Sequence, residues 1–220
     1  MIGSVSRPAC GARPARQVTA MAIAYHVIFT AYGFWLPNDP RGSWSNFVAS
    51  WELFLHGQAS KTTEKCSLAS VPHDPARRRA AKRALSRPPV RFTGAQAQSI
   101  GHGFRMAAQD AEYLCYACAI LPDHVHMVLA IHPRPIKRMV GHLKAIASRE
   151  LSKDGRHPFA NRRNANGSLP TPWVEGCWKR YLDTREEVTQ AIRYVENNPI
   201  KMNLPRQRWL FVMPFAVHAR

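Results

Sequence analysis

The sequence lacks any uninterrupted apolar run that approaches the roughly 20 residues a membrane-spanning helix needs, so we expect no membrane partner. Acidic residues are also scarce: 14 Asp and Glu stand against 31 Lys and Arg, which leaves a formal net charge of +17. Such a surplus favours a polyanionic partner, because each basic contact with a phosphate releases condensed counterions. The composition therefore indicates nucleic acid, although a basic protein that binds anions without specificity has the same charge.

The cysteines follow no framework spacing. An odd number, five, indicates free thiols and a reducing compartment. The five are Cys10, Cys66, Cys115, Cys118 and Cys177. Residues 1–20 hold three arginines and no acid, but they lack the apolar core of a secretory signal. We expect them to be a disordered lead-in, with Met21 opening the folded part.

The remaining 200 or so positions are enough for one domain, and the 45% apolar content is typical of a globular protein. Hydrophobic periodicity and turn residues predict strands that alternate with helices. The expected elements are a strand at 22–30, a turn-rich loop at 35–43, a basic and partly helical segment at 61–91, a helix at 94–112, a hairpin of 114–121 and 124–131, a helix at 133–151, a short strand near 178–182 and a helix from 184 that Pro199 ends. This order predicts an α+β fold, a ferredoxin-like antiparallel sheet with helices packed on it, in a single domain of residues 21–220 with a basic insertion at about 36–92.

The second strand of the hairpin carries two histidines. His124 and His126 are two residues apart, so they project from the same face of the strand. The opposite face must be the core, because it carries Val125, Met127, Leu129 and Ile131. Two neighbouring imidazoles beside a turn are placed to chelate a divalent ion. Two ordinary strand histidines, one in solvent and one satisfied by a hydrogen bond, are the alternative.

A rival site combines Cys115 and Cys118 with the histidines as zinc ligands. The residues between the two cysteines include no turn former, and in a regular strand this odd spacing directs the two sulfurs to opposite faces. We therefore expect no structural zinc.

The last helix places Tyr194 and Asn198 four residues apart, so their side chains are neighbours. Both lie at the edge of the apolar stripe, where a side chain is supported by packing and can still face a cleft. A tyrosine in that position is most often an amphipathic core residue with a solvated hydroxyl. Tyr181 is a competing candidate for a reactive tyrosine.

In order, these motifs resemble a known family. A Tyr-His-Val-x-Phe strand precedes Leu-Pro-Asp-His-Val-His-Met-Val-Leu, a Trp-x-x-Tyr-Leu element follows, and Arg-Tyr-Val-Glu-Asn-Asn-Pro-Ile-Lys closes the pattern. The chain resembles the single-tyrosine HUH transposases of small bacterial insertion sequences, most of all the REP-associated tyrosine transposases. The resemblance extends from about Tyr25 to Leu204, and residues 36–92 match it least securely.

The resemblance implies an HUH endonuclease fold and a metal-dependent enzyme that nicks and joins single-stranded or hairpin DNA. His124 and His126 would be metal ligands with Asn198 as a third, and Tyr194 would be the nucleophile that forms a 5′-phosphotyrosine link. The cofactor would be Mg²⁺ or Mn²⁺, and the protein would act as a monomer or a homodimer in the bacterial cytoplasm, at the nucleoid. The expected DNA-binding residues are Arg77, Arg78, Arg79, Lys82, Arg83, Lys137, Arg138 and Lys144.

Two other functions fit parts of the sequence. A domesticated relative would bind DNA hairpins without cutting them, and its binding would depend steeply on salt. An RNA-binding ferredoxin-like module would instead display stacked aromatic residues on an open sheet face.

Overall fold

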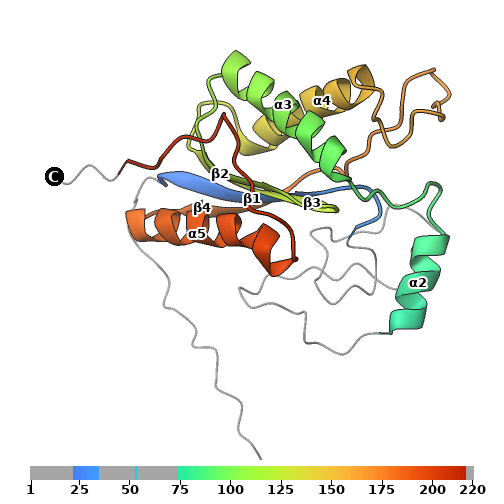
Figure 1. Cartoon of the computed structure of the whole chain (residues 1–220), viewed down its shortest axis with the longest axis horizontal. Helices are drawn as coiled ribbons and strands as arrows, with labels where there is room; N and C mark the ends of the chain where they lie inside the picture. Colours follow the sequence, from blue (N-terminus) through green and yellow to red (C-terminus); the bar gives the residue numbers. More distant parts are fainter. Residues whose placement is uncertain (1–21, 35–52, 54–73, 217–220) are drawn as a thin grey trace, which may run out of the picture.

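The computed structural model describes residues 22–34, residue 53 and residues 74–216 (Figure 1). The expected lead-in at 1–20, Met21, the loop at 35–43 and the part of the basic segment before residue 74 lie outside these residues. The described elements are β1 (Ala24–Thr30), α2 (Pro75–Arg83), α3 (Gly94–Asp110), β2 (Cys115–Ile120), β3 (His124–Ala130), α4 (Ile136–Lys153), β4 (Trp178–Leu182) and α5 (Arg185–Lys201). None of the described helices is long and apolar enough to cross a membrane.

The four strands form one sheet in the order β2-β3-β1-β4, and every neighbouring pair is antiparallel. With α3 and α4 as the connections, this is the βαββαβ arrangement of a ferredoxin-like fold. Helices α3 and α4 cover one face of the sheet, and α5 covers the other (Figure 1). The predicted α+β class is confirmed.

The larger core lies between the sheet and the α3–α4 layer. Strands β1 and β3 alternate, so that Val27 and Phe29 face this layer together with Met127 and Leu129. Helix α3 begins where Thr93 accepts a hydrogen bond from the backbone of Gln96, whose side chain accepts one from the backbone of Thr93.

A smaller core lies between the sheet and α5, and it is built from short side chains. The sheet contributes three alanines, one valine and one leucine to it, and α5 contributes two valines and one alanine. Its members are Ala24, Ala117, Ala119, Val128, Leu182, Val188, Ala191 and Val195. Small residues on the sheet let the axis of α5 approach closely, and this brings the helix over the histidines of β3.

Helix α5 begins as its capping sequence predicts but ends later than expected. The Thr184 hydroxyl accepts the N–H of Glu187, and the Glu187 carboxylate accepts the N–H of Asp183. Pro199 does not end the helix, which continues to Lys201. A proline lacks an N–H and so leaves one carbonyl of the preceding turn unpaired, but a helix can absorb that loss in its last turn.

Strand β2 contains a bulge that changes where its cysteines point. The register shifts between Cys115 and Ala117, so that Cys115 pairs with Leu129 and Cys118 with Met127. Both thiols therefore face the α3–α4 core, and the expectation that they point to opposite faces is wrong. Because a bulge inserts one residue into the alternation, it restores both sulfurs to one side.

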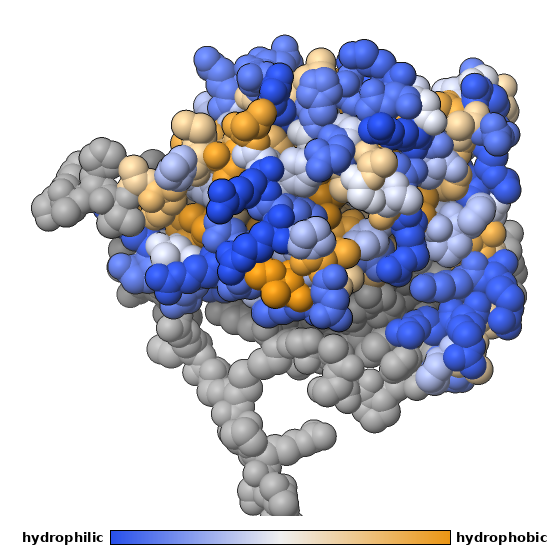
Figure 2. All heavy atoms as spheres, viewed as in Figure 1, coloured by the Kyte–Doolittle hydropathy of each residue, from blue (hydrophilic) through white to orange (hydrophobic). Residues whose placement is uncertain are grey.

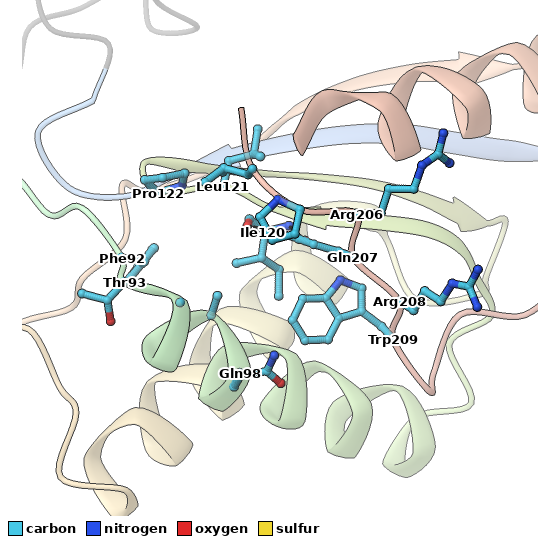
Figure 3. Close-up of a pocket in the computed structure, with 14 residues that line it drawn as sticks. Phe92, Thr93, Gln98, Ile120, Leu121, Pro122, Arg206, Gln207, Arg208 and Trp209 are labelled. Carbon is cyan, nitrogen blue, oxygen red and sulfur yellow. Dashed lines mark hydrogen bonds between the residues drawn. The ribbon is translucent and has the colours of Figure 1, made fainter. Parts of the chain in front are cut away.

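The segment after α5 returns along β2 on the α3 side of the sheet. The Gln207 side chain bonds the N–H and the C=O of Ile120, at 2.8 and 2.7 Å. Trp209 packs on Gly101, and a cavity of about 380 Å³ lies between this segment and the start of α3 (Figure 3). The guanidinium groups of Arg206 and Arg208 point away from the indole of Trp209 (Figure 3). Neither histidine of β3 lines this cavity.

Helices α3 and α4 meet at a glycine. A Cβ atom on Gly103 would lie 2.6 Å from the Cα of Ala147. We predict that Gly103→Ala lowers the free energy of unfolding by about 1–3 kcal/mol, because the helices must move apart. In contrast, Gly141→Ala on the outer side of α4 meets no atom within 4 Å and should add about 0.5–1 kcal/mol through helix propensity. Urea denaturation of both variants measures the difference, and equal effects would contradict the close packing.

Candidate functional site

The two histidines of β3 face α5, away from the larger core. His126 pairs with Ile28 of β1, and His124 pairs with Thr30. The intervening residue, Val125, is fully buried on the α3–α4 side. The predicted division of this strand into a core face and a histidine face is confirmed, although Ile131, which follows the strand, is 41% exposed.

His126 is the more deeply buried of the pair, at 4% exposure. Its Nδ1 lies 3.2 Å from the Nε2 of His26, a residue of β1. Burial is the largest cause that holds the pKa of His126 well below its usual range, and the neighbouring imidazoles of His124 and His26 lower this pKa further. Burial and the charge of Arg180 lower the pKa of His26 to about 4. Both imidazoles are therefore neutral at neutral pH, which is the form that binds metals.

His124 lies at the rim of the site. Its Nδ1 is 2.8 Å from the Asp123 carboxylate, which also forms an ion pair of 3.5 Å with Arg91. The ring of Phe34 stacks on the imidazole at 5.0 Å and 8°. Because an ionised carboxylate can only accept, the neutral form of His124 carries its proton on Nδ1 and has its lone pair on Nε2.

Tyr194 is the tyrosine that α5 places against these histidines. Its ring centroid lies 5.7 Å from that of His26 and 5.6 Å from that of His126. The side chain is supported on one side and 45% exposed. The Lys201 ammonium lies 5.0 Å from the centre of the tyrosine ring, so a positive charge sits beside the phenol.

The competing tyrosine is on the other side of the sheet. Tyr181 pairs with Tyr25 in the β1–β4 register, and the two rings are 5.2 Å apart. Tyr25 belongs to the core beneath α3 and α4. Tyr181 therefore does not share a face with the histidines.

Asn198 is buried one turn beyond Tyr194, at 8% exposure. Its Nδ2 is enclosed and has no hydrogen-bond partner among the described residues. An amide left unpaired in this way carries a desolvation cost, which a bound group could offset. Exchanging the two ends of the amide puts the carbonyl oxygen in the same place with little change in shape, so the position suits a cation ligand.

A metal ion at this site would need donors of more than one kind. Within the described ranges, no group of three or more His, Cys, Asp or Glu side chains is arranged to hold a metal. The donors expected from the sequence are the imidazoles of His124 and His126 and the amide oxygen of Asn198, and His26 adds a third imidazole on the same face of the sheet. Such a set leaves coordination positions for phosphate oxygens and water, as a catalytic site requires.

The cysteines lie apart from these donors. Cys115 and Cys118 are buried beneath α3 and α4, on the opposite face of the sheet from His124 and His126. Burial raises the pKa of the Cys115 thiol to about 12, and that of Cys118 is also raised well above its usual range. Deprotonation to a metal-binding thiolate is therefore costly at both positions.

The basic residues expected at the DNA divide between two helices. On α2, Arg77, Arg79, Lys82 and Arg83 are exposed and Arg78 is half-buried. Hydrophilic residues cover this part of the surface (Figure 2). Lys137 and Arg138 are exposed on α4, which covers the face of the sheet opposite the histidines. A DNA strand that contacted these two residues and also the histidine face would have to pass around an edge of the sheet.

Lys144 differs from the expectation. It is only 9% exposed, and its ammonium donates hydrogen bonds to the carbonyls of Val174 and Gly176. Burial lowers its pKa to about 8. Lys144 was expected at the DNA, but the loop that precedes β4 covers that part of α4. Lys144 therefore secures this loop and does not present its charge at the surface.

Sequence reasoning missed four residues of the site: His26, Phe34, Asp123 and Lys201. Strand alternation contained the signal for His26. This residue lies two places before Ile28, the partner of His126, and therefore faces the same side of the sheet as His126. The Asp123 contact was also recoverable, since it directly precedes His124. The contacts of Phe34 and Lys201 depend on how a loop and a helix end approach the sheet, which no local pattern reports.

No protein-family model matches the chain, and no curated protein sequence matches it at a significant level. Among solved structures, the fold is similar to that of a REP-associated tyrosine transposase bound to a REP hairpin, with a TM-score of 0.44 and 10% identity, covering 88% of this chain and 76% of the other. It is also similar to a crystal structure from Deinococcus radiodurans R1 described as a candidate transposase, with a TM-score of 0.37 and 14% identity, covering 84% of this chain and 97% of the other. At such identities and TM-scores, neither similarity supports a conclusion about function.

The buried histidines predict how stability depends on pH in the absence of divalent ions. The unfolded chain takes up protons at these histidines below pH 6.5, whereas folded His26 resists protonation down to about 4. The unfolded state binds more protons in this window, so the free energy of unfolding falls as the pH is lowered through it. For His26 the loss is about 3 kcal/mol.

Urea denaturation in EDTA at intervals across this pH range measures the slope. His26→Gln should have a shallower slope than the wild-type protein, because a glutamine does not titrate. An equally steep slope in the variant would contradict the burial of a neutral His26.

Proposed function

We propose that this protein is a metal-dependent single-strand DNA endonuclease and strand transferase, a transposase, in which Tyr194 is the nucleophile. The observation that carries the proposal is the position of Tyr194. It packs against His26 and His126 while almost half of its side chain stays open to solvent. A reactive tyrosine must both be held beside its activating groups and reach a macromolecular substrate.

His124, His126 and Asn198 would hold a divalent ion, Mg²⁺ or Mn²⁺. When bound, the ion would polarise the scissile phosphate and offset the negative charge that develops during attack. The chain itself prepares the ligands: low pKa values keep the buried imidazole of His126 neutral, and the Asp123 carboxylate fixes the proton of His124 on Nδ1. Burial of Asn198 supplies an amide oxygen without competition from solvent.

The proposed reaction conserves the energy of the phosphodiester. The phenolic oxygen of Tyr194 bonds to phosphorus, the bond from phosphorus to the 3′ oxygen breaks, and the phenolic proton ends on the released 3′-hydroxyl. The products are a 5′-phosphotyrosine link and a free 3′ end. Attack of another 3′-hydroxyl on that link joins two strands and regenerates the tyrosine, so strand transfer needs no external energy source.

The partner proposed is single-stranded or hairpin DNA. A net charge of +17 supplies the electrostatic attraction. Two cations lie at the site itself: Lys201 beside the tyrosine ring, and Arg180, which pairs in register with His26 and is held by Glu187 at 2.9 Å. The open sheet face that an RNA-binding module would use is covered by helices on both sides, which disfavours that alternative.

We predict that the protein forms a covalent adduct with labelled single-stranded hairpin DNA in the presence of Mn²⁺. The adduct should survive SDS on a denaturing gel, disappear with EDTA and be absent from Tyr194→Phe. Tyr181→Phe is the matched control, because Tyr181 is similarly exposed, at 49%, but lies on the other face of the sheet. That variant should keep at least half of the wild-type yield.

Two outcomes of this assay would contradict the proposal. If Tyr181→Phe lost the adduct and Tyr194→Phe kept it, the nucleophile would be Tyr181, which lies on the opposite face of the sheet from the histidines. Tight, salt-sensitive binding without any adduct, across several hairpins and metals, would favour a DNA-binding protein that does not cut.

The role proposed for Asn198 gives a separate prediction. Asn198→Ala should raise the Mn²⁺ concentration needed for half-maximal adduct formation by about tenfold or more, because a direct ligand is lost. Asn197→Ala is the matched control, since Asn197 is the adjacent residue and is exposed. Hairpin binding in EDTA should be unchanged in both, and an equal Mn²⁺ requirement in the two variants would remove Asn198 from the ligand set.

A further inference from the structure

The two histidines of β3 are held in the same way by different partners. The Nδ1 atom of His124 is bonded to the Asp123 carboxylate at 2.8 Å, and the Nδ1 atom of His126 is bonded to the Nε2 of His26 at 3.2 Å. In the part of the chain that the structure describes, neither Nε2 atom of the pair forms a hydrogen bond. Both rings are thus anchored through one nitrogen and leave the other available.

The tautomer of each ring follows from its partner. An imidazole binds a cation through a nitrogen that has a lone pair, so a ring that uses Nε2 must carry its proton on Nδ1. Asp123 enforces this on His124, because a carboxylate only accepts. The partner of His126 is an imidazole, which can donate or accept, so His126 offers Nε2 to a cation only when His26 accepts.

We propose that His26 is a positioning residue: it accepts a hydrogen bond from Nδ1–H of His126 and so presents the Nε2 lone pair of His126 to the divalent ion. This inference rests on the proposed function, because it assumes that His126 is a ligand. It assigns to the first strand a role in the site that matches the role of Asp123 beside His124.

The surroundings of His26 hold its ring in place. It is 8% exposed, and its ring centroid lies 5.4 Å from that of Trp178, with the two ring planes perpendicular. Its ring is nearly parallel to that of His126, with centroids 5.4 Å apart and planes at 21°, and the two rings meet through the nitrogens that are 3.2 Å apart. The Tyr194 ring also touches it, at 5.7 Å. His26 therefore contacts both the proposed ligand and the proposed nucleophile.

Simple packing is the alternative explanation for a buried histidine at this place. A phenylalanine would fill the same space without accepting a hydrogen bond, whereas a glutamine could accept one through its side-chain oxygen. Comparing His26→Phe with His26→Gln in the full-length protein therefore separates hydrogen bonding from packing.

The first readout needs no metal. Nitrogen-15 NMR of the metal-free wild-type protein at neutral pH should show His126 with its proton on Nδ1. In His26→Phe a substantial fraction of His126 should carry the proton on Nε2, and His26→Gln should retain the wild-type tautomer. A wild-type His126 protonated on Nε2 would overturn the proposal, and this result does not depend on whether any variant folds.

The second readout is Mn²⁺ affinity, measured by titration calorimetry. His26→Phe should bind Mn²⁺ about 10–100-fold more weakly than the wild-type protein, as expected for the loss of a group that orients a ligand. His26→Gln should recover most of that loss, and hairpin binding in EDTA should be equal in all three proteins.

Each other result overturns the inference in a distinguishable way. Wild-type affinity in His26→Phe would mean that His26 only packs. A loss in both His26 variants as complete as in His126→Ala would make His26 a ligand itself. Failure of the wild-type protein to bind Mn²⁺ would refute the proposed metal site and, with it, any role of His26 toward a metal.

Discussion

The site depends on the packing of α5 against the sheet. Alanines at 24, 117 and 119 form a shallow surface on which Val188, Ala191 and Val195 lie. This contact buries the imidazole of His126, encloses the amide of Asn198 and brings Tyr194 to the histidines. Larger side chains on the sheet would hold the helix away and separate the tyrosine from its neighbours while leaving every element intact.

Two opposing electrostatic demands meet at this interface. The protein carries a large positive charge, which would attract a polyanion, yet the proposed metal site needs imidazoles that stay neutral in order to ligate a cation. Burial satisfies the second demand, because desolvation lowers the pKa values of His26 and His126. The charges proposed to face DNA, on α2 and at Lys201, lie outside the enclosed part of the site, where they stay solvated.

Much of the fold could be predicted because its signals are local. Alternation in 124–131 identified the core face of β3, helical periodicity located α3, α4 and α5, and the motifs placed Tyr194 and Asn198 on one helix. The bulge that turns Cys115 and Cys118 to the same side is a register property, and it was missed because single-strand alternation assumes no insertion. The extension of α5 past Pro199 was missed because a proline in a last turn costs less than one in a helix interior.

The site was predicted less completely, and for a different reason. Its candidate ligands and its tyrosine appear in recognisable motifs, but the residues that hydrogen-bond to them or pack against them come from distant parts of the chain. His26 reaches His126 across 100 residues of sequence, and Lys144 is buried by a loop 30 residues away. Such contacts depend on the order of strands and the path of loops, and the sequence pattern of one element contains neither.

The most direct test of the account is to identify the residue that becomes linked to DNA. Protein incubated with hairpin DNA and Mn²⁺ would be digested with protease and nuclease, and the peptide that retains a nucleotide would be sequenced by mass spectrometry. The account predicts a single modified peptide that carries the nucleotide on Tyr194. A nucleotide on Tyr181 or on any other residue would contradict it, because Tyr194 is the tyrosine that lies against His26 and His126 among the described residues.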